Sequence, residues 1–287
     1  MSPLESVLRA AERLLDTTII TSRKATGGYT PAIRIACETA KGRVFVKAGV
    51  TPLTAEFIRR EISVYNRQRG DFMPTFVGAD DQSEIPILII EDLSEHAWPP
   101  PWTTRLIDQV VEQIERMHGT PTDLEPFVEV LGLGESQWET IADDPTAFHS
   151  LDKVAPTWLD SALPTLIEAE KQCSCFGEAL CHLDLRSDNM CIGPSGAVFV
   201  DWNMACRSNA RLDLGFWLPS LQFEGGPPPE SILPDAPDVA AKVAGFFAAR
   251  AGLPPIEDAP FVRRVQREQL ETALPWAVRA LGLPPII

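Results

Sequence analysis

The chain has 287 residues, a length that favours one large domain or two modest ones. Hydrophobic residues make up 45% of it, so a sizeable core can be buried, and no run approaches the ~18 apolar residues of a membrane span. The formal net charge of −15 argues against binding to nucleic acid, whose phosphates require clustered Lys and Arg. An acidic surface favours solubility and also attracts cationic small molecules.

The N-terminal segment and the cysteines indicate a cytoplasmic protein. MSPLESVLRAAERLL is amphipathic and carries Glu5 and Glu12, unlike a signal or transit peptide. The six cysteines show no spacing typical of a zinc site, and we expect free, mostly buried thiols. We therefore expect neither a membrane nor a nucleic acid among the partners.

The first third of the chain predicts a small β-rich unit. An apolar stripe predicts a helix over residues 3–16. TTIITS, AIRIACET and RVFVKAG then predict three strands, separated by turn signals in GGYT and AKG. A helix over 53–69 and two further strands, TFVGA and IPILIIEDL, complete an order of three strands, a helix and two strands.

In EDLSEHAWPPPW, three consecutive prolines exclude a helix interior or a central strand, and the patterns after this segment are mainly helical. The predicted fold class is α+β. A small lobe with an antiparallel sheet and one key helix occupies residues 1–95, a larger, mainly helical lobe occupies 96–287, and the hinge lies near 90–95. The predicted helices of the second lobe are 103–118, 135–143, 155–172, 210–221, 236–251 and 258–281.

The segment HLDLRSDN, residues 182–189, is predicted to be a loop between the strand in GEALCHL and a hairpin, MCIGPSGAVFV, that turns at GPSG. Buried strands on both sides provide the rigid setting that a catalytic group needs. Asn189 and Asp201, at neighbouring strand ends, offer oxygen ligands of the kind that Mg²⁺ prefers. Asp184 can accept a proton from an attacking hydroxyl, so the set matches the requirements of phosphoryl transfer.

The H-x-D-x-x-x-x-N spacing from His182, followed by VFVDW, resembles the catalytic loop and metal-binding strand of the aminoglycoside phosphotransferase and choline kinase-like families, relatives of the protein kinases. The resemblance implies a bilobal protein kinase-like fold with ATP and Mg²⁺ as cofactors. It implies that Asp184 is the catalytic base and that Asn189 and Asp201 are the metal ligands. It also implies structural roles for His182 and for Asp213, which would tie the loop backbone to the next helix.

The first lobe offers a cation for the phosphates. Lys47 ends the apolar strand RVFVKAG, and an ammonium directed into the lobe needs an acidic partner. The helix over 53–69 offers Glu56 and Glu61, and Glu61 is favoured because it lies on a mostly apolar face and is similar to the family's helix glutamate. Gly27 and Gly28 in KATGGYT either let backbone amides approach a phosphate or form a plain hairpin turn, and both alternatives stay open.

The strand in ILIIEDLS ends where the lobes should join. The resemblance implies a hinge that contacts adenine through the carbonyl of Glu91 and the amide of Leu93, with Ile90 as the back wall. Pocket walls of this kind are usually apolar.

The acceptor site is expected among the helices of the second lobe, facing Asp184. A cationic acceptor would need carboxylates, and the candidates, which are otherwise plain surface acids, are Glu135, Glu139, Asp143, Asp144 and Glu224. Arginines near the loop would instead suit an anionic acceptor, and these are Arg186, Arg207 and Arg211. Three tryptophans either line the site or fill the core, namely Trp138, Trp202 and Trp217.

The sequence thus predicts an ATP-dependent O-phosphotransferase that transfers the γ-phosphoryl group to a hydroxyl of a small molecule, such as an aminoglycoside-like compound, an amino-alcohol or a sugar. One alternative is a kinase-fold nucleotide-binding module without turnover, which the presence of every motif residue disfavours. The other is a protein kinase, although no A-P-E sequence follows Asp201 and no long activation segment separates it from the helix at 210. Antibiotic resistance and primary metabolism are not separated by these patterns.

Overall fold

The computed structural model describes residues 2–25, 28–132 and 136–286. Its N-terminal part is a five-stranded antiparallel sheet with the strand order β1-β2-β3-β5-β4. The strands are β1 (Ile19–Lys24), β2 (Ile33–Thr39), β3 (Gly42–Ala48), β4 (Phe76–Asp80) and β5 (Ile87–Glu91). This is the predicted order, with helix α2 (Pro52–Arg67) inserted between β3 and β4.

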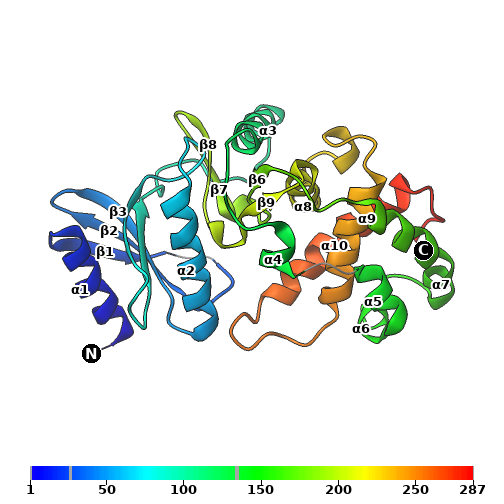
Figure 1. The fold of residues 1–287 in the computed structure, drawn as a ribbon, viewed down its shortest axis with the longest axis horizontal. Coiled ribbons are helices and arrows are strands. Elements are labelled where there is room, and N and C mark those ends of the chain that lie inside the picture. The colour runs from blue at the N-terminus through cyan, green and yellow to red at the C-terminus, as the bar shows by residue number, and fades with distance from the viewer. Residues whose placement is uncertain (1, 26–27, 133–135, 287) are drawn as a thin grey trace.

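Two helices cover opposite faces of this sheet (Figure 1). Helix α1 (Pro3–Leu15) buries Val7 and Ala11 against Val44 and Val46 of β3. Helix α2 packs on the other face, where Phe45 and Lys47 of β3 point because side chains alternate along a strand. The alternation therefore directs Lys47 toward α2.

The ends of both helices follow from the local sequence. Ser2 caps α1 and forms a capping box with Glu5, and Thr51 caps α2 with Pro52 in its first turn. These signals fix where α2 begins relative to β3, and hence which of its side chains faces the sheet.

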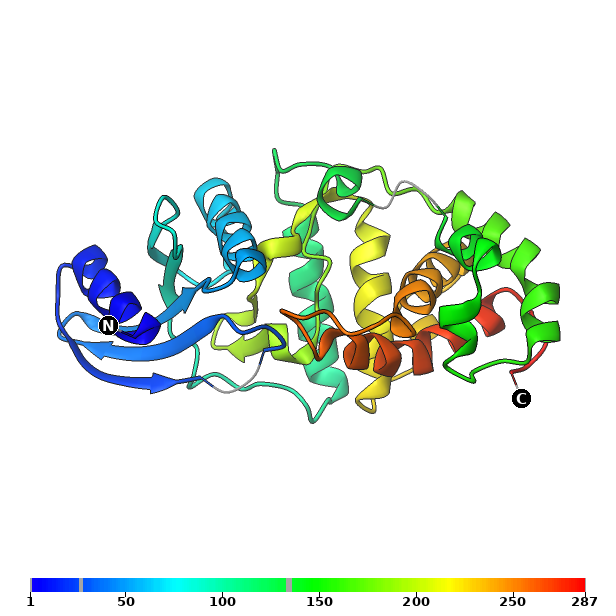
Figure 2. The ribbon, with the colours of Figure 1, turned by 90° about the horizontal axis from the view of Figure 1, so that it is seen from below.

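The rest of the chain is mainly helical and extends away from the sheet (Figure 2). Buried apolar residues of α7, α8, α9 and α10 form one large core cluster. The helices are α3 (Thr104–His118), α4 (Phe127–Leu131), α5 (Gln137–Asp143), α6 (Thr146–His149), α7 (Pro156–Gln172), α8 (Ala210–Phe223), α9 (Pro237–Ala251) and α10 (Val262–Ala280).

Short strands hold the segment between α7 and α8. β6 (Ala179–Cys181) pairs with β9 (Cys206–Ser208), and β7 (Met190–Gly193) pairs with β8 (Gly196–Phe199) in the expected hairpin. Three single-turn 3₁₀ helices lie at Ser187–Asn189, Trp202–Met204 and Pro229–Ser231.

The predicted fold class is confirmed, with differences at the ends of elements. The helix expected from residue 258 begins at Val262, because a turn bridging Ile256 and Ala259 precedes it. The short elements α4, α6 and β9 were not predicted. The division into lobes at 90–95 stays a prediction, and the long connection there runs from Glu91 to Thr104.

Buried side chains confirm the expected free thiols and decide the role of the three tryptophans. All six cysteines are free, and only Cys175 among them is not fully buried. Trp138, Trp202 and Trp217 are fully buried, so they fill the core. Among the described helices, none is both long and apolar enough to cross a membrane.

Candidate active site

The catalytic-loop segment connects β6 to β7 and is fixed by a buried carboxylate. Asp213 of α8 accepts hydrogen bonds from the backbone N–H groups of His182 (2.9 Å) and Leu183 (2.7 Å). These two bonds hold Leu183 in the left-handed region, with φ of 59°, a conformation that a bulky residue adopts only when its surroundings impose it. The tie between loop and helix that the resemblance implies is therefore present.

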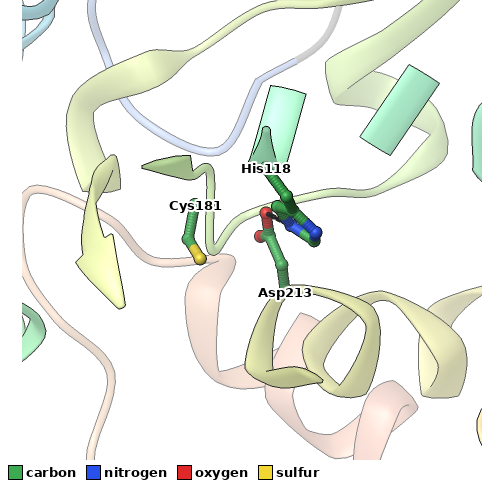
Figure 3. A group of neighbouring side chains, drawn as sticks. All are labelled: His118, Cys181 and Asp213. Carbon is green, nitrogen blue, oxygen red and sulfur yellow. Dashed lines mark hydrogen bonds and ion pairs between the residues drawn. The ribbon is translucent and has the colours of Figure 1, made fainter. Parts of the chain in front are cut away.

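The same carboxylate belongs to a cluster with His118 and Cys181, whose donor atoms lie within 4.8 Å of one another (Figure 3). His118 of α3 lies 3.0 Å from Asp213, measured from Nε2 to Oδ2. Burial raises the pKa of the Cys181 thiol, which therefore stays protonated and is a poor metal ligand. We interpret the cluster as an anchor for the loop.

His182 links the loop to the end of β8. Its Nε2 donates to the carbonyl of Val200 (2.9 Å), and its Nδ1 accepts from the backbone N–H of Asp184 (3.2 Å). Burial lowers the pKa of the imidazole, in keeping with this neutral tautomer. These contacts give His182 the structural position that the resemblance implies.

Asp184 projects from this anchored loop between two hydrogen-bonding neighbours. Asn189 Nδ2 donates to its carbonyl (2.8 Å) and to its Oδ2 (3.0 Å), and Arg186 Nη1 lies 3.0 Å from its Oδ1. Burial raises the pKa of Asp184 to about 6, although Arg186 opposes this shift. A carboxylate with a pKa just below neutrality is well suited to accept a proton from a hydroxyl.

Lys47 joins the sheet, α2 and the segment after β8. Its ammonium is paired with Glu61 and lies 2.7 Å from Asp201 Oδ1. Glu61 also accepts the backbone N–H of Trp202 at 3.4 Å, whereas Glu56 is exposed and pairs with Arg60. The structure thus brings Lys47 together with Glu61, the favoured partner.

Asp201 is held ionised at this junction. Burial by itself would raise its pKa, but Lys47, then Arg34, lower it below the ordinary value. Its backbone is left-handed, with φ of 70°, which directs the carboxylate toward Lys47. Strain of this kind gathers at functional sites.

Two cavities meet at these residues. The first, about 500 Å³, is lined by the expected hinge residues Ile90, Glu91 and Leu93 together with Asn189. The second, about 250 Å³, contains Asp184. Both are lined by the same five residues, namely Gly28, Arg34, Lys47, Asp188 and Asp201. A group bound in one cavity can therefore reach a group bound in the other at this shared wall.

The first cavity has the features of a nucleotide site. Phe45, Ile90 and Val200 give it apolar walls, as is usual for such sites. The backbone N–H of Leu93, at the predicted hinge, forms no hydrogen bond within the described residues. An adenine edge would supply the missing acceptor.

The residues present fit a magnesium ion. Asn189 donates only through Nδ2, and Asp201 binds Lys47 through Oδ1. In the described part of the chain, the remaining oxygens, Asn189 Oδ1 and Asp201 Oδ2, have no hydrogen-bond partner, and both residues line the first cavity. Mg²⁺ is typically held by one or two protein oxygens together with substrate phosphates.

Arg34 is a site residue that the sequence reading missed. It lies directly opposite Lys47 in the β2–β3 register, and its guanidinium donates to Thr30 Oγ1 and to the carbonyls of Thr30 and Ala32. Within the described residues it has no carboxylate partner. Lys47 is paired with Glu61 and Asp201, whereas Arg34 forms no ion pair among the described residues, so its charge is available to a bound anion. If the two strands on either side of the AKG turn had been aligned as a hairpin, Arg34 would have been found opposite Lys47.

Gly28 lies against Arg34 and lines both cavities. Its φ is 78°, and an added Cβ would lie 2.6 Å from Arg34 Cζ. The positive φ favours glycine here, and a larger residue would in addition displace the Arg34 guanidinium. Gly27 lies outside the described residues.

The four described acidic residues that were candidates for binding a cationic acceptor do not line the site. Glu139 pairs with Lys171, and Glu224 accepts from Ser187 and Trp102. Neither of these, nor Asp143 or Asp144, lines either cavity, and Glu135 lies outside the described residues. Two of the arginines are likewise engaged elsewhere, Arg207 with Glu178 and Arg211 with Asp238, so of the three only Arg186 lies at the site.

Comparison with known families agrees with this geometry. Residues 22–246 match the model of the phosphotransferase enzyme family, APH. The chain belongs to this family. The match extends from β1 to α9 and thus contains every residue of the junction described above. No curated protein sequence matches the chain.

Solved structures of the phosphotransferase type share the fold at low identity. Aminoglycoside phosphotransferase APH(4)-Ia in a ternary complex with ADP and hygromycin B aligns with a TM-score of 0.60 at 13% identity, covering 96% of this chain and 98% of that one. Choline kinase LicA from Streptococcus pneumoniae aligns with a TM-score of 0.61 at 15% identity, covering 98% and 99%. Spectinomycin phosphotransferase APH(9)-Ia in complex with ADP and spectinomycin aligns with a TM-score of 0.57 at 12% identity, covering 97% and 98%. The predicted kinase-like fold is therefore confirmed.

Proposed function

We propose that this family member is an ATP-dependent small-molecule kinase that transfers the γ-phosphoryl group to a hydroxyl. The observation that carries the proposal is the meeting of two cavities at a shared wall that contains Lys47 and Asp201, with the expected hinge residues in one cavity and Asp184 in the other. The solved relatives that contain ADP together with an antibiotic support the same division between nucleotide and acceptor.

In this proposal residues 1–95 bind the nucleotide and residues 96–287 supply the catalytic loop and the acceptor site. Adenine lies against Ile90 and contacts the backbone of Glu91 and Leu93 at a hinge near 90–95. Lys47, held by Glu61, contacts the phosphates beneath the loop that contains Gly27 and Gly28. We place the protein in the cytoplasm, where ATP is available.

The chemistry requires one proton acceptor and a stabilised leaving group. Asp184 takes the proton of the acceptor hydroxyl. The oxygen of that hydroxyl forms a bond to the γ-phosphorus, and the bond from the γ-phosphorus to the β,γ-bridging oxygen breaks. The products are ADP and a phosphate monoester. Asn189 and Asp201 would hold Mg²⁺, which supplies neutralisation of phosphate charge when bound. Lys47 and Arg34 add positive charge where negative charge develops on the leaving diphosphate.

Replacing the base tests the proposal. Asp184→Asn keeps the shape of the side chain but cannot take the proton, so we expect kcat to fall roughly 10²- to 10⁴-fold. ADP release is measured over a panel of aminoglycosides, amino-alcohols, sugars and neutral alcohols, and Mg²⁺-dependent ATP binding is measured by calorimetry. ATP binding should persist in the variant.

Asp143→Asn, an exposed position outside both cavities, is the matched control and should behave like the wild type. Failure of the wild-type protein to bind ATP with Mg²⁺ present would refute the assignment. Binding of ATP without ADP release from any acceptor would instead favour a nucleotide-binding module, and phosphorylation of protein substrates alone would favour a protein kinase.

A further inference from the structure

The wall of the second cavity opposite the phosphate junction is apolar. Three phenylalanines dominate it, and their rings pack edge to face, with centroids 5.2 Å apart for Phe216–Phe246 and Phe246–Phe247 and 6.1 Å apart for Phe216–Phe247. Rings locked in this way form a rigid surface. The aliphatic residues of the wall come from α4, α10 and the turn after β8, and they are Leu131, Met204, Val262 and Val265.

Four carboxylates line the cavity, and two cations, Lys47 and Arg186, form ion pairs with all of them. Glu61 and Asp201 pair with Lys47, and Asp184 and Asp188 pair with Arg186. Every carboxylate among the described lining residues is thus already in an ion pair, and an ammonium would have to compete with Lys47 or Arg186 for it. An acceptor that carried a positive charge against the phenylalanines would lose its hydration with no unpaired opposite charge beside it, and a neutral amide oxygen alone does not offset that cost.

Neutral amides supply the polar part of this wall. Asn203, Gln266 and Gln269 line the cavity. The Oδ1 atom of Asn203 is buried and has no hydrogen-bond partner in the described part of the chain. A buried acceptor without a partner costs stability, so a ligand that donates a hydrogen bond there would gain affinity.

We infer that the acceptor is a small, neutral, largely apolar alcohol that carries one further hydrogen-bond donor, and not a polycation. The inference rests on the proposed kinase function and specifies its second substrate. A cavity of about 250 Å³ lies just below the roughly 300 Å³ at which pockets for drug-sized ligands begin, so the acceptor is compact. An aromatic or alicyclic body would lie on the phenylalanines, and its hydroxyl would face Asp184.

A matched pair of alcohols tests whether the site prefers a neutral or a cationic acceptor. 4-Ethylbenzyl alcohol and 4-(aminomethyl)benzyl alcohol have nearly the same shape, but the second is cationic at neutral pH. Their dissociation constants are measured by ligand-observed NMR titration of the protein saturated with Mg²⁺ and AMP-PNP. We expect the neutral member to bind at least about tenfold more tightly, and 4-(2-hydroxyethyl)benzyl alcohol, with its added donor, to bind more tightly still.

A carboxylate placed in the wall should reverse the preference. Gln269→Glu adds one at constant shape and should bring the dissociation constant of the aminomethyl compound to or below that of the ethyl compound. Gln172→Glu on α7 makes the same change outside both cavities and should leave the ratio as in the wild type. If Gln269→Glu does not fold, the double variant Gln266→Glu/Arg263→Gln gives the same test at a partly exposed position of the wall, because Arg263, which donates to Gln266, would otherwise pair with the new carboxylate.

The inference is overturned if the wild-type protein binds the two compounds equally, prefers the cation, or binds neither. Measurements of ADP release show whether such a result refutes only the neutral acceptor or the kinase function as well. Release of ADP with choline or hygromycin B, and with none of the neutral alcohols, would keep the kinase function and refute the neutral acceptor. Tight neutral binding without ADP release from any acceptor would keep the apolar site and refute phosphotransfer.

Discussion

Among the described residues, two buried lysine–glutamate pairs of similar composition lie in different parts of the molecule, one at the cavities and one between α7 and α9. Lys47 and Glu61 are 4% and 1% exposed, and Lys242 and Glu170 are 5% and 2% exposed. Each pair removes two charges from water, which is expensive unless further hydrogen bonds satisfy them. The two pairs meet that requirement in different ways.

Glu170 is satisfied entirely inside the protein. Besides Lys242 at 3.2 Å, it accepts from the Ser136 hydroxyl at 2.5 Å and from the backbone N–H of Trp138 at 3.0 Å, and so it holds the start of α5. Neither member of the pair lines a cavity. The pair containing Lys47 instead lines the shared wall and also holds Asp201. A buried ion pair thus indicates function only where a cavity and unsatisfied ligand atoms accompany it.

Removing each lysine should separate the two roles. Lys47→Met should lower kcat/KM about 10²- to 10³-fold, since it deletes the charge that faces the phosphates. Lys242→Met should leave kcat/KM of the folded protein unchanged but lower the free energy of unfolding by about 3 kcal/mol, because Glu170 remains buried without its cation.

Steady-state ADP release measures the first effect, and urea unfolding followed by tryptophan fluorescence measures the second. If folded Lys47→Met and folded Lys242→Met lose activity equally, the Lys47–Glu61 pair has no role in catalysis that the Lys242–Glu170 pair lacks.

Arg34 differs from both lysines, because it forms no ion pair with a carboxylate among the described residues. Because it faces Lys47 across the sheet and lines both cavities, we expect Arg34→Gln to raise the KM for ATP about tenfold, the loss of a charge-assisted hydrogen bond. Arg60→Gln on α2 is the control, since Arg60 is paired with Glu56 and neither residue lines either cavity. An unchanged KM in the Arg34 variant would remove this residue from the phosphate site.

The sequence was sufficient for features that depend on local periodicity. The alternation in RVFVKAG directed Lys47 away from Val44 and Val46, and the apolar face of α2 separated Glu61 from Glu56. The loop from His182 to Asn189 was recognised because its spacing is fixed within a few residues. In each case the residues that decide the outcome lie close together in the chain.

Features that depend on distant residues were missed or misread. The acceptor wall combines Leu131, Phe216 and Gln269, which no local pattern connects. Glu139 and Glu224 looked available for a cation because their partners, Lys171, Ser187 and Trp102, are far away in the sequence. Arg34 required the strand register, which fixes its neighbour only once β2 and β3 are paired.

The smallest expected effect is a shift in the pH dependence of turnover. Burial raises the pKa of Asp184 to about 6, and the base must be ionised to act, so kcat/KM should fall with unit slope below about pH 6 and level off above it. Arg186 opposes the effect of burial on this pKa, so Arg186→Met should move the break to higher pH, whatever it does to the maximal rate. Arg207→Met, whose arginine pairs with Glu178 outside both cavities, should leave the break in place. A break that stays fixed in the Arg186 variant would mean that another group than Asp184 accepts the proton.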